Sequence, residues 1–208
     1  MTNALPLTQL RDAVDRTVAA GAARVTLHLD FAQNRAKFDA AVPRRRGILP
    51  VLARAIVRRL PKGLDAEGFL DLAGRRAMFD EGRIALLQLE DRVWTGRPGR
   101  TLDSLGAEAP PRFVTPLWLF DTLNDVTALE DHGIDDDPTR PWRHITARTT
   151  AQDNDDTIEV WLDGTHIRRI RLGRDTTTMT LEEFGIDVDE LDWTRLPSYQ
   201  ANAGTSET

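Results

Sequence analysis

The chain has 208 residues, of which 40% are hydrophobic and 29% charged, with a net charge of −6 and no cysteine. This composition is typical of a globular domain that buries a core without covalent crosslinks. The lack of cysteine excludes disulfide bonds, thiolate zinc ligands, a cysteine nucleophile and a lipidated cysteine within these residues. The negative charge argues against nucleic acid as a partner.

The first residues carry no sign of export. No basic segment followed by an apolar run occurs there, as a secretory signal would require. No stretch reaches the ~18–20 apolar residues that cross a bilayer. We therefore expect a cytoplasmic protein.

Apolar residues recur first at helical spacing and then at strand spacing. The first set lies at i, i+3, i+7 and i+11 and predicts a helix that ends before Gly21: Leu7, Leu10, Val14 and Val18. The second set alternates with polar residues and predicts a strand with one face in the core: Val25, Leu27, Leu29 and Phe31.

Every charged residue between positions 43 and 62 is basic. The apolar residues of this segment fall mostly on one side of a helix that we expect to begin near Pro50. Such a helix suits an anionic membrane or an acidic protein partner. The residues expected to make that contact are Arg44, Arg45, Arg46, Arg54 and Arg58. Two alternatives are a lid over the sheet with solvated arginines, and docking onto the chain's own acidic stretch at 130–137.

From Gly63 onward the chain is predicted to be mainly β-structure. A helix is expected to begin at Thr115-Pro116, an N-cap followed by a first-turn proline, and its apolar sequence predicts burial on most sides. Residues 98–112 are expected to form a surface loop. The predicted strands are residues 69–80, 84–89, 93 onward, 142–151, 157–163, 166–172 and 176–184. Their short turns indicate an antiparallel sheet, and the few helices indicate the α+β class.

Several short segments together resemble the LppX/LprG lipoproteins of actinobacteria and the wider LolA-like group. They are Gly68-Phe69-Leu70-Asp71-Leu72 with the following residues to Asp80, the helix 116–123, the hairpin 160–170 and the closing strand 178–197. The resemblance implies a strongly curved antiparallel sheet, or half-barrel, whose concave face is closed by helices and holds acyl chains. It also implies a single domain over 1–198, with 43–62 as a helical insertion and 199–208 as a disordered tail.

This chain departs from that family in having no recognisable signal peptide and no lipobox cysteine. The family's role in lipid transport through the cell envelope therefore does not transfer directly. The expected function is to bind or carry a lipid or other hydrophobic small molecule in an apolar cavity.

The residues expected to line that cavity are apolar members of the predicted strands and of the 116–123 helix. They are Val25, Leu27, Leu29, Phe31, Ile84, Leu86, Trp118, Leu123, Val160, Leu162, Ile170 and Leu181. The competing interpretation is that they fill a packed core, because hollow and filled sheets show the same alternation.

Two further functions stay open. The same pocket could serve a cyclase or isomerase, or the basic helix could make the protein an interaction module. The four histidines, His28, His132, His144 and His166, show no metal-binding spacing. No phosphate loop and no nucleophile elbow occurs, so we expect no metal, no cofactor and no identifiable catalytic residue.

Overall fold

A computed structural model describes residues 7–30, 63–104, 115–135, 137–149, 157–173 and 177–198. The predicted basic helix at 43–62, Phe31 and the predicted tail at 199–208 lie outside the described residues. So does the side chain of Leu29, although its backbone belongs to a strand.

One antiparallel sheet of ten strands dominates the described residues. The strands are β1 (Ala22–Asp30), β2 (Gly63–Asp71), β3 (Arg76–Asp80), β4 (Ala85–Leu89), β5 (Arg92–Gly96), β6 (Val126–Ile134), β7 (Arg143–Thr149), β8 (Thr157–Leu162), β9 (Ile167–Leu172) and β10 (Thr177–Ile186). The helical elements are α1 (Leu7–Ala19), α4 (Pro116–Asp121) and two short 3-10 turns, η1 (Leu102–Ser104) and η2 (Thr122–Asp125). No helix among the described residues is long and apolar enough to span a membrane.

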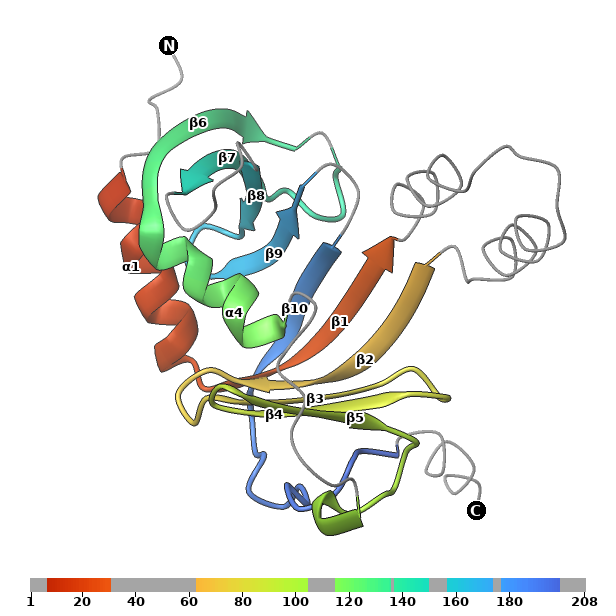
Figure 1. The fold of residues 1–208 in the computed structure, drawn as a ribbon. Helices are drawn as coiled ribbons and strands as arrows, with labels where there is room; N and C mark the ends of the chain where they lie inside the picture. The colour runs from red at the N-terminus through yellow and green to blue at the C-terminus, as the bar shows by residue number, and fades with distance from the viewer. Residues whose placement is uncertain are drawn as a thin grey trace, which may run out of the picture.

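The strand order is β5-β4-β3-β2-β1-β10-β9-β8-β7-β6. The sheet is therefore two meanders, β1–β5 and β6–β10, joined where β1 pairs with β10. At this seam Val25 lies opposite Leu181, and Leu27 lies opposite Met179. The sheet curls strongly and stays open, and α4 lies inside the curl (Figure 1). The predicted α+β half-barrel is confirmed.

The main core lies on the concave face. Side chains alternate between the two faces of a strand, and most buried apolar positions of β1, β8, β9 and β10 point to this side. Leu10 and Val14 of α1 and Leu119 and Leu123 from the α4–η2 segment pack against them and belong to the same buried cluster.

A second, smaller core lies on the convex face of β2–β5. Met78, Leu87 and Trp94 are buried there under the segment that follows β10, whose Leu196 is fully buried. This segment is held by backbone hydrogen bonds from Leu196 N to Arg100 O (2.8 Å) and from Gly99 N to Leu196 O (3.0 Å). The part of the sheet formed by β2–β5, called the hairpin half below, thus has an apolar core on both faces.

The α4 helix begins as its sequence predicts. The hydroxyl of Thr115 accepts a hydrogen bond from Trp118 N at 3.3 Å, and Pro116 occupies the first turn. Leu117, Leu119 and Phe120 are buried, which confirms the prediction of a helix buried on most sides.

Two strand predictions were wrong in detail. The predicted strand 69–80 is a hairpin, in which residues 72–75 turn between β2 and β3 and Arg75 takes a positive φ of 50°. The acidic stretch beginning at 130 was given no strand, yet β6 covers 126–134. An edge strand needs only one apolar face, and Leu129 alone packs into the core from the middle of β6.

Candidate ligand-binding face

The concave face brings most of the predicted lining residues together. Those that are buried share one continuous cluster with α1 and α4: Val25, Leu27, Leu123, Val160, Leu162, Ile170 and Leu181. Each is at most 5% exposed. Among the described residues they pack as core, and their role as ligand contacts stays a prediction.

Three other residues that were predicted to line the cavity are only partly buried or are exposed. Leu86 faces the concave side opposite Phe79 and is only partly buried. Ile84 immediately precedes β4 and is 51% exposed. Since it lies two residues before Leu86, alternation places it on the same face. Trp118 of α4 is 38% exposed.

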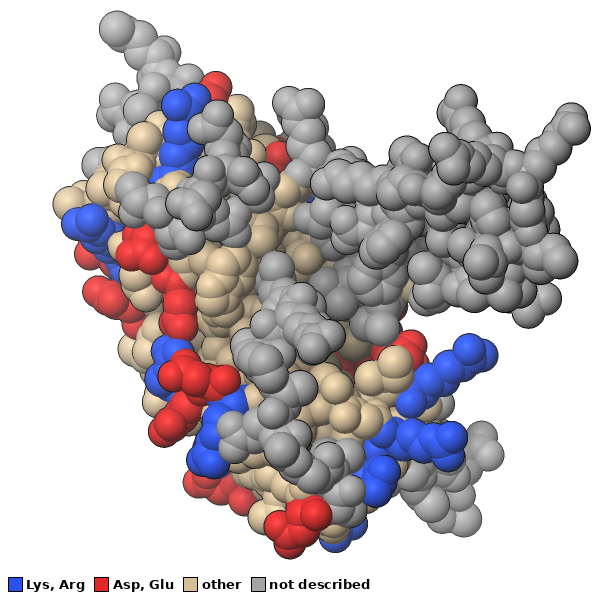
Figure 2. All heavy atoms as spheres, viewed as in Figure 1, with Lys and Arg blue, Asp and Glu red and all other residues tan. Residues whose placement is uncertain are grey.

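Trp118 points away from the packed side of its helix. Its neighbours Leu117, Leu119 and Phe120 are buried, so Trp118 projects from the exposed side of α4, a helix that lies inside the curl (Figure 1). On the face seen in Figure 2, the described surface left uncovered near the middle is mainly uncharged, whereas charged atoms gather along the flanks. Ile84, Leu86 and Trp118 are called the open apolar edge below.

Polar side chains also lie on the concave side of the hairpin half: Thr95, which pairs with Leu86 and is exposed, and the buried Gln88. Gln88, which follows Leu86 by two residues, is 4% exposed. Its amide nitrogen donates to Glu90 O at 3.0 Å, whereas its Oε1 is buried without a hydrogen-bond donor. A buried amide oxygen without a donor can accept a hydrogen bond from a ligand hydroxyl or amide. Sequence reasoning passed over Gln88 because a single glutamine in an apolar strand has no motif.

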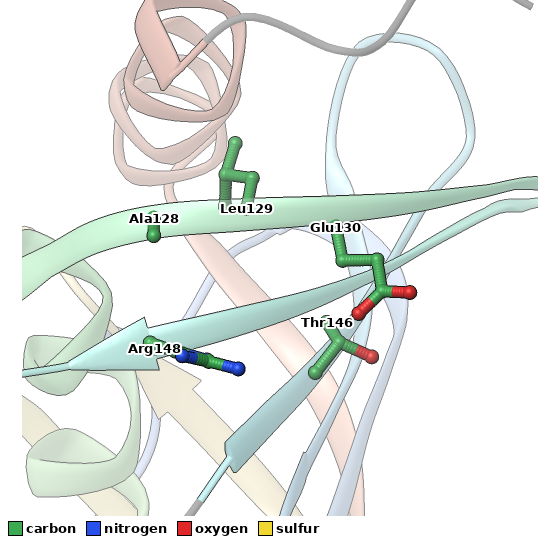
Figure 3. A pocket seen from close by; sticks show the side chains of 5 residues that line it. All are labelled: Ala128, Leu129, Glu130, Thr146 and Arg148. Atoms are coloured by element: carbon green, nitrogen blue, oxygen red, sulfur yellow. The ribbon is translucent and has the colours of Figure 1, made fainter.

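A separate depression of about 190 Å³ lies on the outer pair of strands, β6 and β7 (Figure 3). Its lining is mixed: Glu130, Thr146 and Arg148 share it with Ala128 and Leu129. In Figure 3 the side chain of Leu129 points to the opposite side of β6 from Glu130. The depression is therefore charged and faces away from the core, which does not suit an apolar ligand.

The predicted surface-binding arginines, Arg44, Arg45, Arg46, Arg54 and Arg58, lie outside the described residues. His28 behaves as its position in β1 predicts: it points to the convex side and pairs with Asp65 at 2.6 Å. No group of three His, Asp or Glu side chains suited to a metal ion occurs within the described ranges.

Sequence reasoning missed a row of aromatic and basic side chains on the convex face of β7–β9. His144, Trp161 and Arg169 are direct cross-strand neighbours there. The sequence signal for it was the polar and aromatic residues that alternate with Val160 and Ile170.

Comparison with solved structures places the fold. The chain is similar to LprF from Mycobacterium bovis, with a TM-score of 0.50, 12% sequence identity, and coverage of 90% of this chain and 96% of that one. It is also similar to the Mycobacterium tuberculosis lipoprotein LppX, with a TM-score of 0.46, 13% identity, and coverage of 88% and 97%. Neither known protein families nor curated proteins give a match by sequence. The resemblance predicted from short segments is thus confirmed as a likeness of fold.

Proposed function

We propose that the protein binds a lipid or another hydrophobic small molecule on the concave side of its sheet and acts as its carrier. The observation that carries this proposal is the open apolar edge. A contiguous exposed apolar patch beside a core marks a ligand-binding or interaction surface, and we assign these side chains to one such patch. Of the large hydrophobic residues exposed among the described ones, Ile84 lies on this side of the sheet, and Trp118 belongs to α4, which lies inside the curl.

The fold supports the same proposal. A sheet that curls without closing leaves a concave face that helices cover only in part: α1 contacts β6 and β9, and α4 contacts β3 and β9. Ile84 and Leu86 lie at β4, the neighbour of the β3 strand that α4 contacts. An acyl chain placed there would remove apolar area from water at ~25 cal/mol per Å². Gln88 would offer a buried polar contact.

Native mass spectrometry of the full chain, purified from its own host, tests the proposal. We expect a co-purifying apolar molecule with defined stoichiometry. Loading the stripped protein with cis-parinaric acid, a fluorescent fatty acid, then locates the site.

The variants Ile84→Glu and Trp118→Glu should weaken cis-parinaric acid binding by about tenfold, because each places a charge where the acyl chain of the ligand would lie. Ile134→Glu is the matched control, since Ile134 is 68% exposed at the end of the edge strand β6. Equal affinity in all three variants, or no binding by the wild type, would remove the concave side as the binding site.

A further inference from the structure

Six side chains on the convex face stack into a continuous row. His132 lies 4.7 Å from His144, and His144 lies flat on Trp161 with ring centroids 4.5 Å apart and an interplanar angle of 2°. The guanidinium of Arg169 contacts both Trp161 (5.4 Å) and Trp142 (5.2 Å), measured to the ring centroids. The row ends at Arg140, whose guanidinium lies 5.3 Å from the centroid of Trp142. The β6–β7 connection, which holds Arg140 and Trp142, is thereby folded against the sheet.

Arg169 differs from the arginines around it. Arg168 binds Asp163, Arg171 binds Glu159, and Arg143 binds Asp131. The guanidinium of Arg169 is half-buried between two indoles and has no hydrogen bond or ion pair with any described residue; its Nε is fully enclosed. Its terminal nitrogens remain available, and together they offer a planar fork of N–H donors.

The surroundings leave this charge only partly compensated. Burial lowers the pKa of Arg169, and the nearby charges of Arg140 and Arg171 lower it further, whereas those of Asp135 and Asp137 raise it. Both carboxylates are engaged elsewhere. Asp135 accepts from the indole N–H of Trp161 at 2.7 Å, and Asp137 accepts from the backbone N–H and the hydroxyl of Thr139.

Arg140 likewise has no ionic partner among the described residues. Its guanidinium contacts Trp142 but forms no ion pair with the described residues. The charge of Arg140 lowers the pKa of Arg169, and the half-burial of Arg169 adds to the cost of its charge unless an anion neutralises it. The structure thus holds a two-cation site that lacks its anion partner among the described side chains.

We propose that Arg169 and Arg140, held by Trp142 and Trp161, form a binding site for a phosphate group on the convex face. The guanidinium fork matches the spacing of phosphate oxygens, and two cations match the charge of a phosphate monoester, about −1.5 to −2 at pH 7. The phosphate belongs to a small soluble molecule or to a lipid headgroup. This site is separate from the proposed apolar site, on the opposite face of the sheet.

Titration of the full chain with inorganic phosphate at constant ionic strength tests the site. The readouts are the Nε–H resonance of Arg169 in ¹⁵N NMR spectra and the tryptophan fluorescence. We expect a saturable change in both. Arg169→Gln and Arg140→Gln should each weaken phosphate binding by about tenfold, and Arg169→Lys should restore only part of it because the ammonium lacks the fork.

Arg148→Gln is the matched control. Arg148 lies on the convex side of β7, is exposed, has no ion pair with the described residues and contacts no tryptophan. Its loss should change phosphate affinity by less than about twofold. Arg140 is also exposed, so its variant tests the site even if Arg169→Gln disturbs folding. No saturable change in the wild type, or an equal loss in Arg148→Gln, would overturn the proposal.

Vesicles separate the two sources of the phosphate. Co-sedimentation with phosphatidylcholine vesicles containing phosphatidic acid, lost in Arg169→Gln and absent with pure phosphatidylcholine, would assign the site to a lipid headgroup. Saturable phosphate binding without co-sedimentation would assign it to a small soluble phosphorylated molecule. Both results support the site itself, and neither depends on an apolar ligand in the concave face.

Discussion

At the scale of single residues, Gly68 shows how closely the strands of the hairpin half approach one another. A Cβ at this position would lie 1.9 Å from the carbonyl oxygen of Met78 and 2.9 Å from the Cα of Phe79. Both contacts are with backbone, so the strand pair must shift to admit any side chain. We expect Gly68→Ala to lower the free energy of unfolding by about 1–3 kcal/mol in urea titrations. Thr95→Ala, at an exposed position of β5, should leave it nearly unchanged.

Asp163 gives a pH-dependent contribution to stability. Burial alone would raise its pKa, but the N–H groups of His166 and Thr165 and the guanidinium of Arg168 outweigh burial and hold the pKa at about 2. Because the folded pKa lies below the ordinary value of 3.8, this stabilisation is complete above about pH 5 and is lost as the pH falls through 2. Its size is roughly 2 kcal/mol.

The measurement is urea unfolding of Asp163→Asn and the wild type between pH 2 and pH 7. The variant should be less stable at pH 7 by up to roughly 2 kcal/mol, and the two curves should converge toward pH 2. Asp125→Asn is the control, since Asp125 is exposed and forms no hydrogen bond with the described residues. A constant difference across the whole pH range would contradict the role assigned to Asp163.

At the scale of elements, the hydroxyl of Thr17 links α1 to the sheet by a hydrogen bond, in addition to the apolar packing of the helix. Thr17 is fully buried, donates to Ala13 O within the helix at 2.6 Å, and accepts from the backbone N–H of Ile167 at the start of β9 at 2.9 Å. Thr17→Val keeps the shape of the side chain but leaves that N–H without an acceptor. We expect a loss of about 1–3 kcal/mol in thermal or urea unfolding. Thr17→Ser keeps the hydroxyl and should recover most of the loss.

The elements also show how far the sequence could predict this fold. The helix at Thr115-Pro116 was predictable because its cap and its first-turn proline are local signals, and both operate in the structure. The β6 strand was not predictable, because it is an edge strand that buries only one face. Its acidic sequence is also typical of a surface loop. The row from His132 to Arg140 depends on strand register across β6–β9, which local patterns do not specify.

At the scale of the whole molecule, the two meanders form locally, but the seam between them does not. Within each meander consecutive strands pair, whereas β1 at residues 22–30 pairs with β10 at residues 177–186. The α4 helix bridges this seam, because it contacts β3 on one side of the pair and β9 on the other. The α1 helix precedes β1 but contacts β6 and β9. The curvature that makes the concave face depends on this long-range pairing.

An engineered disulfide tests the seam directly, since the chain has no cysteine of its own. Thr26 and Thr180 are paired across β1 and β10 on the convex face, where paired Cα atoms lie about 4.5–5.5 Å apart, within disulfide range. The double variant Thr26→Cys/Thr180→Cys should form the bond on air oxidation. Because the bond closes a very long loop, it should stabilise the protein by roughly 3–5 kcal/mol relative to its reduced form.

The register control is Thr26→Cys/Thr178→Cys. Thr178 pairs with His28 instead, so its Cα lies diagonally from that of Thr26, about 7–8 Å away and beyond disulfide reach. Thiol titration and non-reducing electrophoresis should show that Thr26→Cys/Thr180→Cys is crosslinked and that Thr26→Cys/Thr178→Cys stays reduced. Efficient crosslinking of the diagonal pair, or none of the direct pair, would mean that β1 and β10 meet in another register. The alternation that puts Val25 and Leu27 on the concave face would then have to be reassigned.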